Sequence, residues 1–306
     1  MRKLHYYLVD VFTDRLFGGN PLAVFTDAQG ISTELMQSIA REMNLSETTF
    51  VLPADTPGTD YRVRIFTPGV ELPMAGHPTI GTAFVLARAE MITRPLVTFG
   101  EGVGPVPVTI QPGLIEMQQP LPAFRARFEA EAVAAVLSLD ARAITDTGLP
   151  AEVVSCGVPL LFVPVRDLAA IRAIRMRLDR WESTLQGSEG QHVFVFTREV
   201  EFPGSAVHAR MFAPASGIPE DPATGGACGP LGSYLVRHGV IEAAPRAEFT
   251  CEQGIEMGRP SFIRIVIEQE AGAISAVRVG GNCCFVGEGD LEIPSGQVPD
   301  CPRPAL

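Results

Sequence analysis

Glu47 is the first residue in this sequence whose type and position could support acid–base chemistry. It lies between a predicted amphipathic helix, about Thr33 to Asn44, and a predicted apolar strand, Thr49 to Leu52. A carboxylate at such a boundary comes close to apolar surroundings. Loss of hydration there raises its pKa toward the working pH, as a general acid or base requires. The alternative interpretation is a surface or helix-capping glutamate.

Two segments rich in small residues, each at the start of a predicted helix, form the candidate ligand site. The first contains Gly76-His77-Pro78-Thr79, and the second contains Asp221 and Thr224-Gly225-Gly226. Small residues let backbone N–H groups approach a carboxylate or phosphate, and the helix dipole assists. The candidate substrate-binding residues are Gly76, Pro78, Thr79, Thr224, Gly225 and Gly226. Ordinary helix capping without a ligand is the alternative for one such start alone.

His77 and Asp221 are the titratable side chains at these two starts. A helix N-terminus disfavours an imidazolium, so His77 is expected to be a neutral hydrogen-bonding partner, with a structural histidine as the alternative. Asp221 is expected to cap its helix through the N–H of Ala223 or Thr224 while facing the substrate.

Metal and nucleotide sites are not indicated by the sequence. The five histidines include no HxxxH or HxH pair, so no metal is predicted. The glycines between Gly225 and Gly232 resemble a dinucleotide loop, but no βαβ unit follows, so no cofactor is predicted. The six cysteines, including Cys301, show no CxxC spacing and are expected to be free thiols. Cys228, near the second start, is an alternative catalytic group without a partner thiol.

Composition restricts the class of protein. The 306 residues are 46% hydrophobic and 19% charged, which is typical of a globular protein of about two domains. The net charge of −11 argues against binding to nucleic acid or anionic lipid. Asp10 interrupts the apolar start before signal-peptide length, and the apolar run Val158 to Val165 is too short to span a membrane. We therefore expect a cytoplasmic protein with no nucleic acid or membrane partner.

The two halves of the sequence resemble each other. The segment Gly19 to Phe25 is echoed by Gly157 to Val163, and Arg64 to Pro68 is echoed by Arg210 to Pro214. In each half the later helix is apolar or small on every side and must therefore be buried on every side. These features predict an α+β fold of two similar domains, each a curved sheet or barrel around a central helix. A cleft between the domains would receive both helix starts.

Prolines 120 and 122 mark the predicted boundary between domains 1–120 and 121–306, and the last strand is expected to pack back on the first domain. A second amphipathic helix is expected where an apolar stripe runs from Leu168 to Trp181. Its arginines Arg172, Arg175 and Arg180 would form a solvated face.

An ordered series of motifs spans nearly the whole sequence. The motifs are Asp10-Val11-Phe12-Thr13, Gly19-Asn20-Pro21-Leu22-Ala23-Val24, Asn44-Leu45-Ser46-Glu47-Thr48, Arg64-Ile65-Phe66-Thr67-Pro68, Glu71-Leu72-Pro73, Gly76-His77-Pro78-Thr79, Glu220-Asp221-Pro222-Ala223-Thr224-Gly225, Gln253-Gly254, Met257-Gly258-Arg259-Pro260-Ser261 and Gly280-Gly281. This series resembles the PhzF-like family of phenazine-biosynthesis-type isomerases, whose duplicated fold is shared with diaminopimelate epimerase and proline racemase.

The resemblance implies two pseudo-symmetric diaminopimelate epimerase-like domains and a homodimer. It also implies a cofactor-free proton-transfer isomerase in which Glu47 is the acid/base group, with His77 and Asp221 beside the substrate. This sequence departs from the family pattern at Gly226, where a serine is usual. It also lacks the two facing cysteines of the related epimerases, because its first helix start offers Ala75 and His77 instead.

The leading hypothesis is a cofactor-independent isomerase that moves a proton between carbons of a small, carboxylate-bearing metabolite. A racemase or epimerase is the alternative among enzymes, but inversion needs opposed groups on both faces of a carbon. A noncatalytic ligand-binding protein is the alternative outside enzymes. If the site is real, Glu47, His77 and Asp221 must converge in one pocket.

Overall fold

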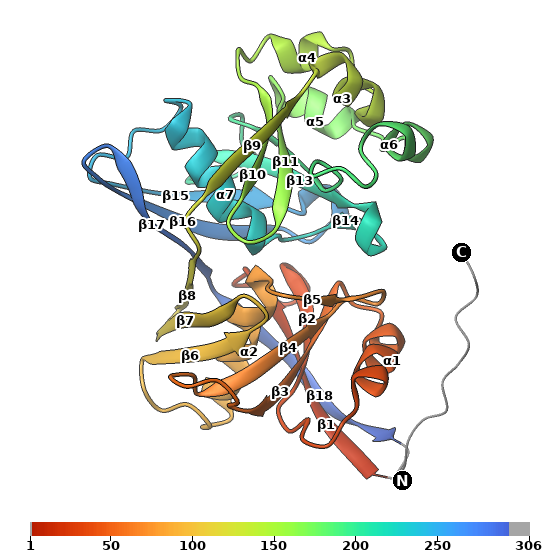
Figure 1. Cartoon of the computed structure of the whole chain (residues 1–306), viewed down its shortest axis with the longest axis vertical. Helices are drawn as coiled ribbons and strands as arrows, with labels where there is room; N and C mark the ends of the chain where they lie inside the picture. The colour runs from red at the N-terminus through yellow and green to blue at the C-terminus, as the bar shows by residue number, and fades with distance from the viewer. Residues whose placement is uncertain (1, 294–306) are drawn as a thin grey trace.

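The computed structural model describes residues 2–293, which form two halves lying one above the other (Figure 1). Cys301 lies outside the described residues. Within residues 2–293, no helix combines the length and apolar character needed to span a membrane.

In the first half, strands both precede and follow one central helix in the chain. In chain order its elements are β1 (Arg2–Val11), β2 (Asn20–Phe25), α1 (Thr33–Met43), β3 (Glu47–Pro53), β4 (Tyr61–Phe66), β5 (Glu71–Leu72), α2 (Gly76–Arg88), β6 (Leu96–Glu101), β7 (Gly104–Gln111) and β8 (Leu114–Gln119). Helix α1 confirms the amphipathic helix expected from about Thr33 to Asn44, and Asn44 ends it in a left-handed conformation.

The second half repeats this plan with extra helices. Its elements are β9 (Ala123–Phe128), α3 (Ala130–Leu137), α4 (Arg142–Thr145), β10 (Ala151–Ser155), β11 (Pro159–Pro164), α5 (Leu168–Ala173), α6 (Leu178–Thr184), β12 (Val193–Thr197), β13 (Val207–Ala213), β14 (Ile218–Asp221), α7 (Gly225–Arg237), β15 (Arg246–Gln253), β16 (Ser261–Glu270), β17 (Ala273–Gly281) and β18 (Cys283–Ile293). Short 3₁₀ turns cover Pro214–Ser216 and Ile255–Met257.

Strand pairing repeats in the two halves. Strands β1 to β8 pair with one another in a pattern that β10 to β17 reproduce, including the parallel pairs β2–β3 and β11–β12. Strand β8 also pairs antiparallel with β17, which joins the two halves. Each half thus combines helices with a sheet that has the same pairing order, which confirms the predicted α+β fold of two similar halves.

One of the two remaining strands crosses between the halves. Strand β9, the first element of the second half, pairs with β10 of the same half. Strand β18 follows the second half and pairs with β1 in the first, from Arg2–Ile293 to Val11–Cys283. Figure 1 shows β18 running back from the upper half beside β1. The domain limits 1–120 and 121–306 stay a prediction, because strand pairing alone does not define a folding unit.

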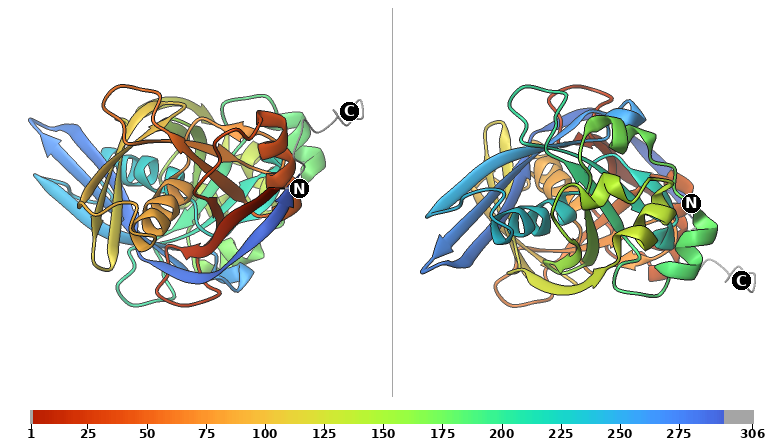
Figure 2. Two further views of the ribbon diagram at one scale, coloured as in Figure 1. Left: turned by 90° about the horizontal axis from the view of Figure 1, so that it is seen from below. Right: turned by 90° about the horizontal axis from the view of Figure 1, so that it is seen from above.

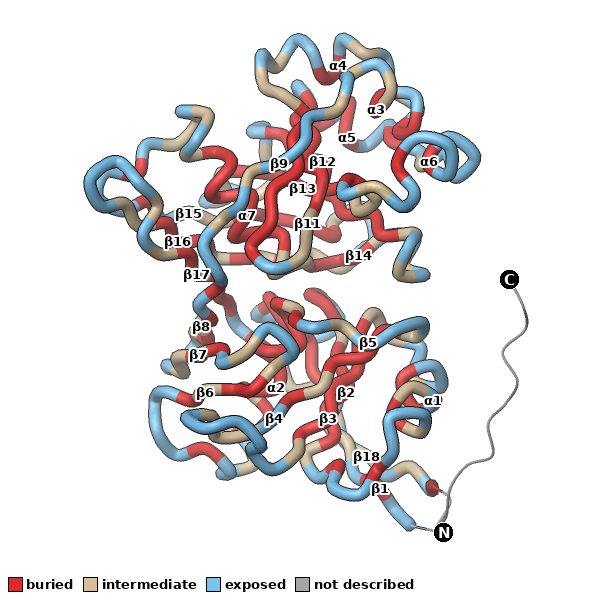
Figure 3. Tube along the Cα trace, in the orientation of Figure 1, coloured by how far each residue is buried: buried red, intermediate tan, exposed pale blue. Residues whose placement is uncertain are grey.

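Helices α2 and α7 occupy the centre of their halves. In the two end-on views of Figure 2 each lies among the strands of its own half. Residues Gly76 to Ala83 of α2 and Ala227 to Leu235 of α7 are buried without interruption, and both helices appear mostly as buried tube in Figure 3. These helices are apolar on every side because strands surround them.

The prediction of a single helix between Leu168 and Trp181 is wrong. Helix α5 ends at Ala173, and α6 begins only at Leu178. Between them, the N–H groups of Arg175 and Arg177 donate to the carbonyls of Leu137 and Val136 at the end of α3. These long-range hydrogen bonds replace helical ones, so the apolar stripe continues through an extended segment. The three arginines of the stripe are exposed, as expected.

Candidate active site

A cavity of about 100 Å³ lies between the two halves. The first half contributes Glu47, Thr67, Leu72, Met74, Ala75, Gly76 and His77; the second contributes Val158, Leu160, His192, Met211, Ala213, Ser216, Ile218, Asp221, Thr224, Gly225 and Gly226. Glu47, His77 and Asp221 therefore line one cavity, as predicted from the sequence. Of the candidate binding residues, Pro78 and Thr79 lie deeper in α2 and do not line the cavity.

Strand pairing and helix starts position the three titratable groups. Glu47 is the first residue of β3, held in parallel register with Leu22 of β2. His77 is in the first turn of α2, and Asp221 is the last residue of β14, paired with Met211. Each side chain is thus fixed by a rigid element where that element meets the cavity.

Asn20 connects the two halves at this site. Its Nδ2 group donates to Oδ1 of Asp221 at 2.8 Å and to the carbonyl of Ala223 at 3.0 Å, and lies 3.2 Å from Nδ1 of His77. Because an amide nitrogen cannot accept a hydrogen bond, this contact favours the tautomer of His77 in which Nδ1 is unprotonated and Nε2 carries the ring hydrogen. Asn20 was not among the predicted site residues, although it lies in the Gly19-Asn20-Pro21 motif.

Glu47 and His77 face each other in a buried environment. Oε2 of Glu47 lies 3.2 Å from Nε2 of His77, and neither atom makes a hydrogen bond in the described structure. Burial, with a second contribution from the charge of Asp221, raises the pKa of Glu47 well above its usual range. Burial lowers the pKa of His77 to about 3. The pair is therefore a carboxyl group that can hold a proton near neutral pH beside a neutral imidazole.

Asp221 is held by side chains of both halves. Burial raises its pKa to about 6, while hydrogen bonds from Thr224 and Asn20 oppose this shift. The sequence predicts that Asp221 accepts a hydrogen bond from the N–H of Ala223 or Thr224. The N–H of Thr224 donates instead to Oε1 of Gln253 at 3.0 Å. Nε2 of Gln253 in turn donates to the Asp221 carbonyl at 2.7 Å. Gln253, another residue not predicted, orients the loop that carries Asp221.

The N-termini of α2 and α7 touch at the cavity. A Cβ atom added to Gly76 would lie 2.5 Å from the carbonyl carbon of Gly225 and 2.5 Å from the backbone nitrogen of Gly226, so the close approach requires glycine at position 76. Neither helix start carries a side-chain cap, since Ala75 and Thr224 make no capping hydrogen bond. Two uncapped helix starts with converging dipoles favour an anionic group between them.

Thr79 interacts with a second buried carboxyl group rather than with the cavity. Its Oγ1 lies 2.6 Å from Oε1 of Glu101 and 2.7 Å from the carbonyl of Ala75. Burial raises the pKa of Glu101 to about 8, against the lowering effect of the Thr79 hydrogen bond. Cys228, the alternative catalytic thiol, is fully buried in the core and is not among the residues lining the cavity.

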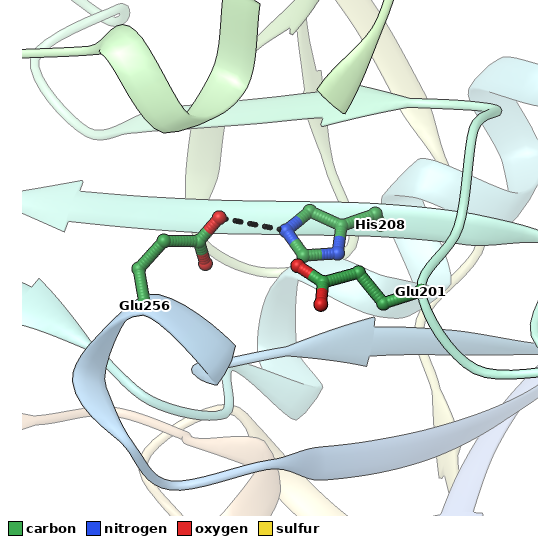
Figure 4. A group of neighbouring side chains, drawn as sticks. All are labelled: Glu201, His208 and Glu256. Carbon is green, nitrogen blue, oxygen red and sulfur yellow. Dashed lines mark hydrogen bonds and ion pairs between the residues drawn. The ribbon is translucent and has the colours of Figure 1, made fainter. Parts of the chain in front are cut away.

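One group of side chains in the described structure has the composition of a metal site. Ligand atoms of Glu201, His208 and Glu256 lie within 4.8 Å of one another (Figure 4). Nδ1 of His208 is 2.9 Å from Glu252, and Nε2 is 3.0 Å from Glu256. Burial opposes a charge on His208, but these hydrogen bonds outweigh it and raise its pKa to about 9. An imidazolium that donates from both nitrogens offers no lone pair to a metal.

The comparisons with known proteins cover nearly the whole chain. The family model described as phenazine biosynthesis-like protein matches residues 9–289. A trans-2,3-dihydro-3-hydroxyanthranilate isomerase from Pseudomonas chlororaphis is 37% identical, over 94% of this chain and 99% of its own. The solved structure of a phenazine biosynthesis protein of the PhzF family from Bacillus anthracis is 26% identical, with a TM-score of 0.86 over 96% of this chain and 100% of its own. A hydroxyproline epimerase from Agrobacterium vitis shares the fold at 13% identity, with a TM-score of 0.59 over 95% of this chain and 92% of its own.

Proposed function

This chain belongs to the phenazine biosynthesis-like family and is an isomerase, and from that premise we propose that it moves a proton between two carbons of a small, carboxylate-bearing metabolite. The observation that carries the proposal is the buried Glu47 carboxyl group facing a neutral His77 where two helix starts meet. The reaction needs one group that can both take and return a proton, and Glu47 has the environment for it.

The helix starts are proposed to bind the substrate carboxylate. The residues that line the cavity include no lysine or arginine, so a ligand carboxylate must find its donors elsewhere. The backbone N–H groups at Gly76, Gly225 and Gly226 supply them, and the dipoles of α2 and α7 add a favourable field. Glycine at position 226, where the family pattern has a serine, removes one hydroxyl that could hold a polar group of the substrate.

Glu47 is proposed to carry the proton between the two carbons. It removes a proton from one carbon, the C–H bond breaks, and the electron pair enters the conjugated system of the substrate. The same carboxyl group then returns a proton to another carbon. The Nε2–H of His77 stabilises the carboxylate form of Glu47, while Asp221 and Asn20 fix the ring of His77 from the opposite side.

The test uses trans-2,3-dihydro-3-hydroxyanthranilate, the compound in the name of the Pseudomonas chlororaphis relative. Glu47→Gln keeps the shape of the side chain but cannot titrate, so we expect kcat to fall by about 10²- to 10⁴-fold with a much smaller change in KM. In D₂O, the wild-type product should contain deuterium at the carbon that gains hydrogen.

Cys228→Ala is the matched control, since the thiol is the other candidate group near the second helix start. It should retain turnover once its folding is verified by circular dichroism. Full activity of Glu47→Gln together with loss of activity in Cys228→Ala would replace the carboxylate mechanism with a thiol mechanism.

Assembly and location are proposed on the family resemblance alone. We infer a homodimer in the cytoplasm, and light scattering of the purified protein tests the dimer directly. A monomer at assay concentration would contradict it.

A further inference from the structure

His192 occupies the position in the second half that Glu47 occupies in the first. In the parallel pair β2–β3, Leu22 lies opposite Glu47 and Ala23 opposite Thr48. The echo of Gly19-Asn20-Pro21-Leu22 by Gly157-Val158-Pro159-Leu160 aligns Leu22 with Leu160 and Ala23 with Leu161.

The pairing in the second half then identifies the residue equivalent to Glu47. Leu161 lies opposite Val193 in the parallel pair β11–β12, and its N–H donates to the carbonyl of His192 at 2.8 Å. Val193 is therefore the counterpart of Thr48, and His192 is the counterpart of Glu47. The internal repeat relates these two titratable side chains across the cavity.

His192 lines the same cavity as Glu47, His77 and Asp221. Its surroundings there are largely apolar, with Val158, Leu160 and Met211 contributed by the same half. Nδ1 of His192 is buried and has no hydrogen-bond partner in the described structure. A buried polar atom without a partner is costly, and a ligand in the cavity can supply the missing interaction.

We propose that His192 is a second proton-transfer group of this active site, contacting the substrate from the half opposite Glu47. The proposal rests on the proposed function: it keeps the isomerisation and the proton delivery by Glu47, and it assigns removal of the substrate proton to His192 in place of Glu47. An acid and a base then face opposite sides of the substrate. Burial lowers the pKa of His192, so the imidazole is neutral at rest and can act as the base. Glu47, with its raised pKa, can begin as the acid.

The proton transfers balance. Neutral His192 takes the proton from one substrate carbon, the C–H bond breaks, and its electron pair enters the conjugated system of the substrate. The carboxylic acid of Glu47 delivers its proton to another carbon and becomes a carboxylate. Exchange with water then removes the proton from the imidazolium and restores the one on Glu47. If both groups act on the same carbon, the outcome is inversion, which is the chemistry of an epimerase.

The experiment separates this arrangement from one in which Glu47 acts alone. The full-length enzyme is incubated in D₂O with trans-2,3-dihydro-3-hydroxyanthranilate, and ¹H NMR follows both product and loss of carbon-bound hydrogen from unreacted substrate. With two groups, Glu47→Gln loses turnover but still exchanges substrate hydrogen, because the base remains. His192→Gln loses both turnover and exchange by about 10²-fold or more. His238→Gln, a half-buried histidine of the second half outside the cavity, should keep both.

Different failures identify different errors. If Glu47→Gln abolishes exchange and His192→Gln keeps wild-type turnover, His192 is not a proton-transfer group, while the proposed function stands. If Glu47→Gln keeps full turnover, the proposed function fails at Glu47 itself.

A second measurement does not depend on turnover. In protein labelled with ¹⁵N on histidine, saturating trans-2,3-dihydro-3-hydroxyanthranilate must shift the NMR signals of the His192 ring nitrogens. These signals are assigned by their absence in His192→Gln. Unshifted signals overturn the proposal.

Discussion

Burial is the main influence on the protonation of Glu47 and His77, the pair proposed to take part in catalysis. Desolvation is the leading cause of the raised pKa of Glu47 and of the lowered pKa of His77. Both shifts favour the neutral forms of two groups that lie 3.2 Å apart. In the proposed mechanism, a site with neutral groups excludes water and becomes charged only when the substrate binds.

Glu101, which lies away from the cavity, is another carboxyl group whose pKa is raised by burial, and the pH dependence of stability tests this effect. Its carboxyl group accepts from the Thr79 hydroxyl, which lowers its pKa, but burial outweighs this hydrogen bond and raises the pKa to about 8. Glu101 therefore holds a proton at neutral pH in the folded state. The folded state therefore holds a proton that the unfolded chain releases above its ordinary pKa of 4.5. Its contribution to stability is fully present below that pH and is lost as pH rises through about 8.

We expect Glu101→Gln to be more stable than the wild type at pH 8, with the difference shrinking toward pH 4.5. A glutamine amide is uncharged at every pH, so the variant avoids the cost of ionising a buried carboxyl group. Urea denaturation at several pH values measures the free energy of unfolding of both proteins. Parallel curves for the two proteins would show that Glu101 is ionised in the folded state.

Sequence reasoning found the residues whose chemistry is visible in one motif. Glu47, His77 and Asp221 were each identified and do share a cavity. Asn20 and His192 were not predicted as site residues, because contacts between segments far apart in the chain bring them to the site. No motif surrounds His192, and its correspondence to Glu47 emerges only from the strand register.

The contact between the starts of α2 and α7 is the element on which the site depends. Gly76→Ala would place a methyl group against the backbone of Gly225 and Gly226, which cannot move like a flexible side chain. We expect a loss of about 1–3 kcal/mol in the free energy of unfolding, as for other overpacked positions, and a drop in kcat. Thermal unfolding and steady-state kinetics measure the two effects.

Gly113→Ala is a control for the general cost of adding a methyl group to a glycine. Position 113 has positive φ but nothing within 4 Å of the added atom, so its substitution should leave kcat unchanged. Wild-type kinetics in Gly76→Ala would mean that the helix starts do not have to touch.

Periodicity predicted elements well where a helix packs against its own sheet. Helix α1 was found within one residue of its end, and both central helices were recognised as buried. The stripe from Leu168 to Trp181 failed because hydrogen bonds to the end of α3 interrupt the helix. A periodic pattern reports which side chains are buried, and a segment can bury them without being helical throughout.

At the scale of the whole molecule, β18 makes the first half depend on the second. A chain that ends at Asn282 lacks β18 and leaves β1 with an unpaired edge, while β9 to β17 remain complete. We expect hydrogen exchange to show rapid exchange in α2 and the strands around it, and protection in α7. A synthetic peptide of residues 283–293 should restore protection of α2. Equal protection of both helices in the truncated chain would contradict this dependence.

Because β18 pairs with β1, the order of synthesis also affects the order of folding. The ribosome releases β1 first and β18 on the order of 15 to 60 s later at typical elongation rates of roughly 5–20 residues per second. Throughout that interval β1 lacks one of its partner strands, and α7 and β17, which contact elements of the first half, are made only in its last part. The second half can close as soon as β17 emerges. The later-made half can therefore be completed first, and a translation product that ends before β18 has an incomplete first half.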